Sequence, residues 1–578
     1  MSKQDLTYIE MNTADDFECF NFREKLKIAK KPYDYFKEIK DLDFEQLASS
    51  DRFFLQDFGI YNNELNDEEF TLRLRFPAGR ISNKSLLLLA NIAKEYNLQI
   101  ILTARAGIQL HGLQSNNILE VFTKINNDEI STYQSFGDNI RNITSDIFDG
   151  VGKYNIIEVY SYIEKMQSYI LNNKEYLGLL PRRLSIGISG SYANVNSFFA
   201  SDIYFALAKK DDIYGFNVYL GGKNTQIAQE ANIFLPKDDL VDFFIAFIEV
   251  FNKYGLRFDR NNNRLFHLIE KIGMEKLKEY LQIAYKKQWQ TKGETLLEKV
   301  NFSEFEKLKN GKYSFCYRSL FARIEASELH TIAAWAIKDN LQIRLGTDQQ
   351  IYLFNLQVPN VPIVHYNGNR TMLACAGSDF CPYAYWNIKD EIQSLPLVKI
   401  ENNNILVGFS GCLKGCPKHE HSDIGLVGLK SDLHGKREKT ARIYLGGLYT
   451  FGEATARIIF DAIPLNALKE LLEIIIDEYE KSTYSQFELF SKNLLNTFST
   501  NFLSSWFLAK YKTKEKVYLE NNITENKLFK KNFSNFPFTN LSENNNFDNI
   551  TKILYQELWF NEDTQENKKL KNTYILKA

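Results

Sequence analysis

Four of the six cysteines in this 578-residue chain fall in two close pairs. Cys375 and Cys381 stand in the segment CAGSDFC, and Cys412 and Cys416 stand in the segment GCLKGCP. Four thiolates from two loops can bind the four irons of a [4Fe–4S] cluster, because each iron needs one sulfur ligand. The main alternative is a structural zinc site, although zinc ribbons favour a Cys-x2-Cys knuckle on each side. We therefore interpret the four cysteines as candidate cluster ligands.

A second group of polar and basic residues is predicted to lie on one face of a sheet. Side chains alternate between the two faces of a strand, so every second residue shares a face. In residues 72–76 the alternation groups Arg73 with Arg75. Such a face binds anions if it is buried, and the alternative is an ordinary solvated sheet face. The candidates are Arg75 in the strand 72–76, Arg105 in a turn, and Gln109 and His111 in the strand 108–113.

The chain also repeats itself. Residues 71–113 align without a gap on residues 314–356 at an offset of 243, and each copy reads as strand, helix, strand, turn, strand. A second pair of segments repeats at an offset of 221, where Ser189-Gly190 matches Ser410-Gly411. Because the two blocks recur in the same order, we expect a duplicated module of the form A-B-A′-B′ with pseudo-twofold symmetry.

The two copies differ where chemistry is expected. Cys412 and Cys416 replace Ser191 and Val195 of the first copy. A loop that folds with serine and valine does not need two thiols for packing, so the second copy carries an additional ligand function. The first copy carries the polar residues instead: Arg105 aligns with Asp348, Gln109 with Tyr352 and His111 with Phe354.

Composition limits the remaining possibilities. The net charge of -2 and the pI near 6.5 give no bulk attraction to nucleic acid or to an anionic membrane. No apolar stretch reaches the roughly 20 residues that a membrane span needs, and the start of the chain does not resemble a secretory signal. We expect a cytoplasmic protein. Cys19 and Cys316 lack a cysteine partner in the sequence and are expected to be ordinary thiols.

The cysteine segments carry a family resemblance. Cys375-x5-Cys381, then Ser410-Gly411-Cys412-x3-Cys416, then the segment DIGLVG resembles the siroheme and iron–sulfur signature of the sulfite/nitrite reductase family. The resemblance implies siroheme and a [4Fe–4S] cluster as cofactors, with Cys416 bridging the cluster and the siroheme iron. Where the family has asparagine in this loop the chain has Lys414, for which we keep two alternatives: contact with a siroheme carboxylate, or solvent.

The resemblance extends to the basic residues. The segment TARAGIQLHG is similar to a family segment whose arginine and glutamine contact siroheme, which are here Arg105 and Gln109, with His111 beside them. Arg75 and Arg141 correspond to substrate arginines. The segment LPRRLS resembles one in which two lysines line the sulfite site; here Arg183 and Ser185 stand in their places. Relatives that reduce nitrite tend to have a neutral residue at the second position.

Taken together, the sequence predicts an oxidoreductase that transfers six electrons to a small oxyanion. Sulfite is the first expectation and nitrite the alternative; an iron–sulfur electron-transfer protein without siroheme and a zinc-stapled binding protein are rivals of other classes. No dinucleotide-binding motif is visible, so the donor is expected to be a ferredoxin or a flavoprotein.

The resemblance implies an α+β fold with two ferredoxin-like half-domains and two siroheme-type α/β domains. The predicted segments are an N-terminal extension (1–70), half-domain 1 (71–150), siroheme-type domain 1 (151–310), half-domain 2 (311–372), the [4Fe–4S]/siroheme domain 2 (373–485) and a C-terminal extension of unknown role (486–578). The last is rich in Asn and Lys, and it is expected to cap the domain, to dock a partner or to be solvated.

Overall fold

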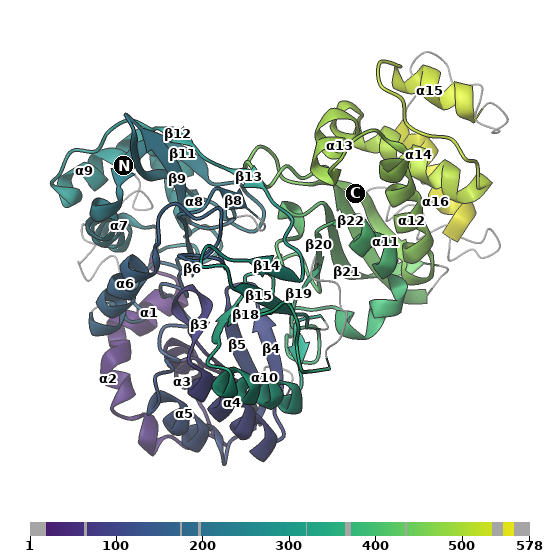
Figure 1. The fold of residues 1–578 in the computed structure, drawn as a ribbon. Helices are drawn as coiled ribbons and strands as arrows, with labels where there is room; N and C mark the ends of the chain where they lie inside the picture. The colour runs from purple at the N-terminus through teal and green to yellow at the C-terminus, as the bar shows by residue number, and fades with distance from the viewer. Residues whose placement is uncertain are drawn as a thin grey trace. The chain divides into compact units, whose positions relative to one another are not determined.

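A computed structural model of the chain describes residues 19–62, 66, 68–173, 176–194, 198–319, 321–364, 372–433, 436–533 and 547–559. The chain forms two compact units (Figure 1). The first comprises Met1–Gly368 with Thr450–Gly452, and the second comprises Asn369–Tyr449 with Glu453–Ala578. The boundaries of the six predicted segments stay predictions.

The first half-domain follows the sequence pattern closely. The Ser82 hydroxyl caps α4 (Asn83–Glu95) by accepting from the backbone N–H of Ser85, as expected of a serine at this position. The predicted apolar face of α4 is buried against the sheet. Its sheet runs in the order β1 (Ile60–Asn62), β2 (Glu69–Arg73), β5 (Gly107–Gln114), β4 (Gln99–Thr103) and β16 (Arg323–Ile324).

One strand prediction was too long. We expected a strand over residues 72–76, but β2 ends at Arg73. The backbone N–H of Leu74 still donates to Ile108 of β5, whereas Arg75 pairs with Ser131 instead. The chain therefore leaves the sheet at this point, which alternation in a short segment cannot reveal.

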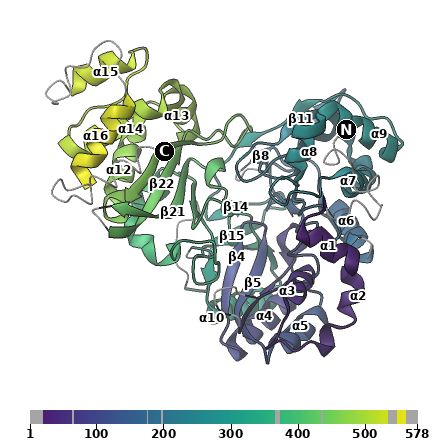
Figure 2. The same cartoon turned by 180° about the vertical axis from the view of Figure 1, so that it is seen from behind.

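The second half-domain has the same plan, and the two exchange strands. Its sheet runs in the order β14 (Phe305–Lys307), β15 (Tyr313–Tyr317), β18 (Ile351–Leu356), β17 (Gln342–Leu345) and β3 (Arg80–Ile81). β3 of the first copy completes the sheet of the second, and β16 does the reverse. Helices α4 and α10 (Ala326–Lys338) lie side by side across this exchange (Figures 1 and 2).

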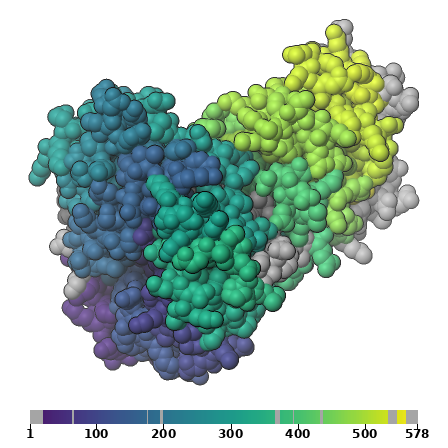
Figure 3. Space-filling view, viewed as in Figure 1, coloured from purple at the N-terminus to yellow at the C-terminus, as the bar shows by residue number. Residues whose placement is uncertain are grey.

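The exchange joins the two half-domains within the first unit. In the space-filling view the N-terminal part of the first unit, in purple and blue, lies against the teal and green residues of the second half-domain (Figure 3). The structure thus confirms the α+β duplicated module with pseudo-twofold symmetry.

The two larger sheets also share one topology. In each, three parallel strands are followed by two antiparallel ones. In the first unit the order is β6 (Thr144–Ser145), β7 (Ile186–Ser189), β9 (Ile203–Lys210), β10 (Ile213–Leu220) and β11 (Gln229–Pro236); in the second it is β19 (Met372–Ala374), β20 (Val407–Ser410), β21 (Ile424–Leu433), β22 (Lys436–Leu445) and β23 (Arg457–Pro464).

A buried aspartate occupies the equivalent position in each sheet. Asp202 accepts from the backbone N–H of Ser185, and Asp423, at the offset of 221, accepts from that of Leu406. Both carboxylates are fully buried at the start of the third strand. The repeat therefore extends to individual hydrogen bonds.

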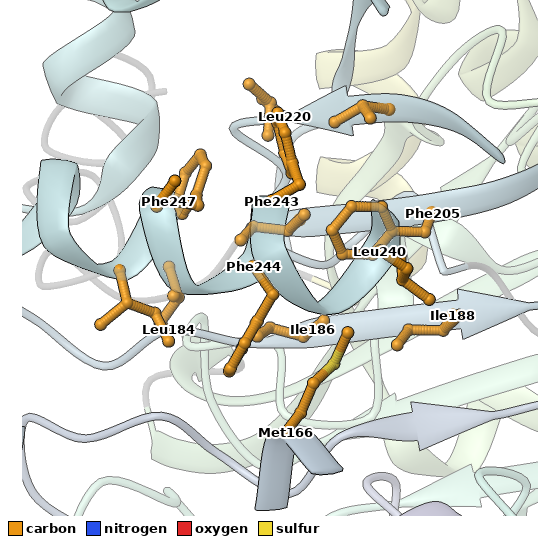
Figure 4. Close-up of a cluster of buried hydrophobic side chains, with 14 of the residues drawn as sticks. Met166, Leu184, Ile186, Ile188, Phe205, Leu220, Leu240, Phe243, Phe244 and Phe247 are labelled. Atoms are coloured by element: carbon orange, nitrogen blue, oxygen red, sulfur yellow. The ribbon is translucent and has the colours of Figure 1, made fainter. Parts of the chain in front are cut away.

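The core of the first large sheet is packed by helices on one face. Figure 4 shows Ile186, Ile188 and Phe205 of the sheet against Phe243 and Phe244 of α7. These side chains are buried, and each buried side chain of this size contributes about 2 kcal/mol to folding. The other elements around this sheet are α6 (Tyr160–Asn172), α7 (Leu240–Tyr254), α8 (Leu265–Ile272), α9 (Met274–Tyr285), β8 (Ala193–Asn194), β12 (Glu294–Thr295) and β13 (Glu298–Lys299).

The C-terminal residues form helices on the second sheet. α14 (Thr500–Thr513) packs against α12 (Leu465–Lys481), β23 and α16 (Phe547–Trp559), as Figure 1 shows in yellow-green. The remaining helices of the chain are α1 (Phe22–Ala29), α2 (Pro32–Phe36), α3 (Ser49–Leu55), α5 (Ile118–Asn126), α11 (Leu397–Asn402), α13 (Phe487–Asn493) and α15 (Glu525–Asn532). The described part of this extension is folded, and its role as a cap or as a docking surface stays a prediction. None of the helices described is long and apolar enough to cross a membrane.

Candidate metal and anion sites

The four paired cysteines lie in the second unit, on loops that follow neighbouring strands. Cys375 comes directly after β19, and Cys412 comes shortly after the end of β20. The two strands pair in parallel, so their carboxyl ends meet at one edge of the sheet. Cys381 and Cys416 lie further along the same two loops. The topology therefore brings the two predicted pairs together.

Backbone hydrogen bonds join these loops. The N–H of Gly411 donates to Sγ of Cys375 at 3.1 Å, and the N–H of Tyr385 donates to the carbonyl of Gly411 at 3.0 Å. Gly411 has no room for a side chain, because a Cβ would lie 2.8 Å from Cβ of Ala384. The loop carrying Cys381 is thus folded directly over the start of the loop carrying Cys412.

The thiols are close enough to affect one another's ionisation. Burial raises the pKa of Cys375 to about 12 and that of Cys412 to about 11, and the charge of Cys416 adds to both. Burial also raises the pKa of Cys381, again with a contribution from Cys416. Such thiols keep their protons at neutral pH until a metal ion binds and displaces these protons, because metal coordination deprotonates a thiol.

Two kinds of metal site can be compared for these cysteines. Among the residues that the structure describes, no three His, Cys, Asp or Glu side chains converge closely enough to hold a single metal ion. A tetrahedral zinc site needs all four sulfurs about 2.3 Å from one ion. In a [4Fe–4S] cubane each sulfur binds a different iron, so the sulfurs stand farther apart. The four cysteines have the chemistry that a cubane requires, and their assignment as its ligands stays a prediction.

Lys414 lies between the second pair of cysteines on an exposed turn. Its ammonium is placed over the ring of Tyr383, which follows Cys381 by two residues in the first cysteine loop. This cation–π contact links the two cysteine loops. The predicted contact of Lys414 with siroheme stays a prediction.

The predicted anion site lies in the first unit and centres on Arg141. Hydrogen bonds of Asn139 hold the loop that carries Arg141. The Asn139 side-chain amide donates to Oδ1 of buried Asp57 at 2.7 Å, and its oxygen accepts from the N–H of Gly178. The N–H of Arg141 donates to the carbonyl of Leu184 at 2.8 Å. These bonds place Arg141 next to the segment that contains Arg183 and Ser185.

The guanidinium of Arg141 is buried among other guanidinium groups. Burial lowers its pKa well below the ordinary value, and the charges of Arg73, Arg183 and Arg105 lower it further. Nη2 donates to the carbonyl of Gly137, but Nη1 is buried and has no hydrogen-bond partner. Like charges around an unused donor form an arrangement that an anion stabilises. Three residues predicted from the sequence, Arg105, Arg141 and Arg183, thus belong to one positive cluster.

Asp138 balances part of this charge on the other side of the loop. Arg260 donates to both of its oxygens, at 2.7 and 2.6 Å, and Lys27 of α1 lies 2.9 Å from Oδ2. Burial alone would raise the pKa of Asp138, but Lys27 and Arg260 hold it well below the usual range. The carboxylate is therefore committed to these partners and ties α1 to the loop.

Arg75 is not placed as the sequence predicted. Its side chain is fully buried; Nε donates to the Gln167 side chain, Nη1 to the carbonyl of Ile140 and Nη2 to that of Arg141, each at 2.8 Å. Burial lowers its pKa to about 9, so the group remains charged at neutral pH. These bonds of Arg75 stabilise the Arg141 loop, whereas we had expected the Arg75 guanidinium to face a substrate.

Ser185 and His111 are also engaged with protein groups. The Ser185 hydroxyl donates to Oδ2 of Asp202 at 2.6 Å, and Arg264 pairs with the other oxygen of that carboxylate. Nδ1 of His111 lies 2.8 Å from the hydroxyl of Thr71, and the ring is buried. Ser185 is therefore a neutral, structurally bound residue at its position, and the predicted catalytic role has no support from these contacts.

The remaining polar candidates are Gln109, in β5, and Arg105, in the turn before it. Gln109 of β5 pairs in register with Arg73 of β2 and is half-buried, and Arg105 is half-buried in the turn before β5. The carbonyl of Arg105 accepts from the amide of Asn142, which anchors the turn to the Arg141 loop. The predicted contacts of Arg105, Gln109 and His111 with siroheme stay predictions.

Sequence reasoning missed several residues of this site. Arg73 was grouped with Arg75 but not proposed as a site residue; its guanidinium stacks on Phe136, over which Arg141 also lies. Asp57 and Asp138 were not singled out. Asp138 lies in the same short segment as Arg141, and this proximity was the available signal. Asp57 is distant in sequence and gave none.

A siroheme fits the chemistry of the positive cluster. The macrocycle carries carboxylates around its rim, and the first unit presents several guanidiniums, with one buried donor of Arg141 unused. The second unit presents the thiols for a cluster. Both donor sets match the groups that the sequence predicted.

Comparisons with known proteins match two parts of the chain. Residues 63–127 match the nitrite/sulfite reductase ferredoxin-like half domain, and residues 136–289 match the nitrite and sulphite reductase 4Fe-4S domain. The second match covers the copy without the paired cysteines.

Whole-chain relatives point the same way. The ferredoxin–nitrite reductase of Synechococcus elongatus is 27% identical over 74% of this chain and 91% of its own length. The chloroplastic ferredoxin–nitrite reductase of Spinacia oleracea is 24% identical over 79% of this chain and 85% of its own length. The Mycobacterium tuberculosis NirA structure shares the fold, with a TM-score of 0.75, 20% identity, and coverage of 83% of this chain and 97% of that one.

The chain matches two domains of the nitrite and sulfite reductase family and is similar over most of its length to named members of that family. It is an oxidoreductase of that family, with siroheme and a [4Fe–4S] cluster as its cofactors.

Proposed function

We propose that the protein reduces nitrite to ammonia, taking six electrons one at a time from a ferredoxin. This is the second of the two substrates that the sequence left open. The relatives cited above are named as ferredoxin–nitrite reductases. The observation that carries the choice is Ser185: a neutral hydroxyl bound to Asp202 stands where the sulfite enzymes of this family have a lysine.

The positive cluster supports binding of a small anion. In this proposal Arg141 and Arg183 hold the substrate oxygens, and Arg105 and Gln109 hold siroheme carboxylates. Arg75 stabilises the Arg141 loop by donating to the carbonyls of Ile140 and Arg141. Guanidinium groups are poor proton donors near neutral pH, so the protons for reduction come from water admitted to the site.

The paired cysteines support the electron path. We assign Cys375, Cys381, Cys412 and Cys416 as the residues that would bind the cluster. When bound, siroheme and the cluster supply the redox chemistry, and the protein supplies position, charge and exclusion of bulk solvent. The high thiol pKa values in the absence of metal mean that loading with iron must release protons.

The test is a turnover comparison on holoenzyme purified without oxygen. With reduced viologen as donor we expect a kcat/KM for nitrite at least tenfold above that for sulfite, and reduced ferredoxin should replace viologen. A preference for sulfite would contradict the proposed substrate. A flavoprotein that supports turnover where ferredoxin fails would contradict the proposed donor.

A further inference from the structure

Because the chain is duplicated, the segment that follows Cys416 can be compared with its counterpart in the copy without paired cysteines. His419 begins the short helix η9 (His419–His421), and the offset of 221 aligns it with Phe198. Both side chains are buried. Both also pack against a strand glycine: a Cβ on Gly187 would lie 2.6 Å from the Phe198 ring, and one on Gly408 would lie 2.8 Å from Cα of His419. The copy without paired cysteines therefore uses an apolar ring where the other copy uses an imidazole.

The preceding serine changes partner between the copies. In the first copy the Ser189 hydroxyl donates to the carbonyl of Ser191, two residues along the same turn, at 2.9 Å. In the second copy the equivalent Ser410 hydroxyl lies 2.9 Å from Nδ1 of His419, and both groups are buried. The hydrogen bond that closes a local turn in one copy thus connects β20 to η9 in the other.

This bond lies one peptide away from a cysteine sulfur. Ser410 precedes Gly411, whose N–H donates to Sγ of Cys375 at 3.1 Å. The orientation of that N–H depends on the peptide that joins Ser410 to Gly411. Fixing the Ser410 side chain therefore limits the movement of the donor that faces the sulfur.

The imidazole is itself held in place. Its ring lies 4.8 Å from the ring of Tyr444, and η9 packs so closely on β21 that a Cβ on Gly425 would lie 2.2 Å from the carbonyl oxygen of His419. Nε2 is buried without a hydrogen-bond partner, 3.6 Å from a carboxylate oxygen of Glu420. A buried imidazole with one nitrogen unused is costly, and an apolar ring fits the equivalent place in the other copy.

We propose that His419 is a positioning residue for the iron–sulfur cluster, which acts through Ser410 to aim the Gly411 N–H at the sulfur of Cys375. The inference rests on the proposed cluster ligands. A hydrogen bond to a ligand sulfur stabilises the more negative, reduced cluster and so raises its midpoint potential. The copy without paired cysteines has no such sulfur and needs no such histidine.

The test compares four variants of the full-length holoenzyme. His419→Phe introduces the residue of the other copy, and Ser410→Ala removes the same bond with a smaller change. His419→Asn keeps a polar atom near the place of Nδ1 and should rescue the bond. Ser189→Ala makes the matched serine change in the copy without paired cysteines.

The first measurement is the cluster midpoint potential from a titration followed by electron paramagnetic resonance. We expect a more negative potential in His419→Phe and Ser410→Ala, and the wild-type value in His419→Asn and Ser189→Ala. Failure of the first two to retain iron, while the other two load fully, would equally support the proposal. An unchanged potential in fully loaded His419→Phe and Ser410→Ala would overturn it.

The second measurement separates this inference from the proposed ligands. In the iron-free protein, hydrogen exchange at the Gly411 amide should be roughly fivefold faster in His419→Phe and Ser410→Ala, because the loss of one buried hydrogen bond of about 1 kcal/mol loosens the peptide. If wild-type protein holds no cluster, the ligand assignment fails, and this exchange still reports whether His419 holds the peptide. Equal exchange in all the proteins would overturn the positioning role.

Discussion

At the scale of residues, the two buried arginines Arg75 and Arg141 have different roles. All three side-chain nitrogens of Arg75 donate to protein acceptors, whereas Arg141 keeps one donor unused among like charges. A guanidinium whose three nitrogens each donate to the protein stabilises the fold, and one that has a nitrogen without a partner in a positive field is available to an anion. Their different roles follow from the partners they find in space.

Replacing each arginine by glutamine should separate these tasks. Arg75→Gln leaves two buried carbonyls without donors, so we expect a loss of about 3 kcal/mol in the free energy of unfolding. Arg141→Gln relieves repulsion, so stability should change little while the KM for nitrite rises at least tenfold. Urea unfolding of the iron-free variants and steady-state kinetics of the loaded ones measure the two effects. Equal loss of stability in both variants would contradict the assignment.

Asp57 predicts a dependence of stability on pH. Burial raises its pKa to about 7, and the Asn139 hydrogen bond only partly opposes this. The unfolded carboxyl ionises near its usual value of 3.8, so between about pH 4 and pH 7 the unfolded state is increasingly favoured. Asp57→Asn removes this cost, and we expect it to gain on wild type by up to about 4 kcal/mol across that range.

Asp138 should behave in the opposite way, because its pKa is depressed. Its contribution is present above the unfolded pKa and is lost only as the pH falls well below it. Asp138→Asn should therefore lose about the same stability at every pH between 4 and 8, whereas the gain of Asp57→Asn grows with pH up to about 7. Melting temperatures of both variants between pH 4 and pH 8 test the pair, and parallel pH profiles would refute the two assignments.

At the scale of elements, the sequence predicted what repeats locally. The order of strand, helix, strand, turn and strand in each half-domain follows from the repeat and was confirmed. Alternation could not show that β2 ends at Arg73, because Arg75 pairs with a residue far along the chain. Nor could it show the exchange of β3 and β16, since each strand is only two residues long.

The C-terminal helices show how composition can mislead. The Asn- and Lys-rich tail suggested solvent, but most of α14 is buried, and its apolar run around Trp506 was the overlooked signal. Glu478 of α12 holds this helix: it accepts from the indole of Trp506, the ammonium of Lys510 and the N–H of Leu519, at 2.8, 2.6 and 2.9 Å. The side chains of Glu478 and Lys510 are nearly inaccessible.

Removing one partner of this buried pair should destabilise the second unit. We expect Glu478→Ala to cost about 3 to 5 kcal/mol, because it leaves the Lys510 ammonium buried without its carboxylate. The double change Glu478→Met with Lys510→Met removes both charges and should cost much less. Urea unfolding and limited proteolysis of α14 measure the difference. A single variant as stable as the double one would show that the pair does not hold the helix.

At the scale of the whole molecule, the duplication explains the division of labour. Each copy keeps the same sheet topology and the same buried aspartate, while the thiols occur in one copy and the positive cluster in the other. The sequence could predict this plan, because the gapless repeats showed both the similarity and the places where it fails. It could not predict which arginine would be enclosed, because that depends on loops that pack only in the folded chain.

The central claim is that one chain holds both a [4Fe–4S] cluster on the four paired cysteines and a siroheme. The direct measurement is an absorption spectrum with iron, zinc and acid-labile sulfide analysis on protein purified without oxygen, alongside Cys381→Ser as a ligand variant. The account predicts siroheme absorption, iron and sulfide in cluster proportions in the wild type, and loss of the cluster signal in the variant. Stoichiometric zinc without siroheme absorption, or a variant that keeps an intact cluster, would contradict it.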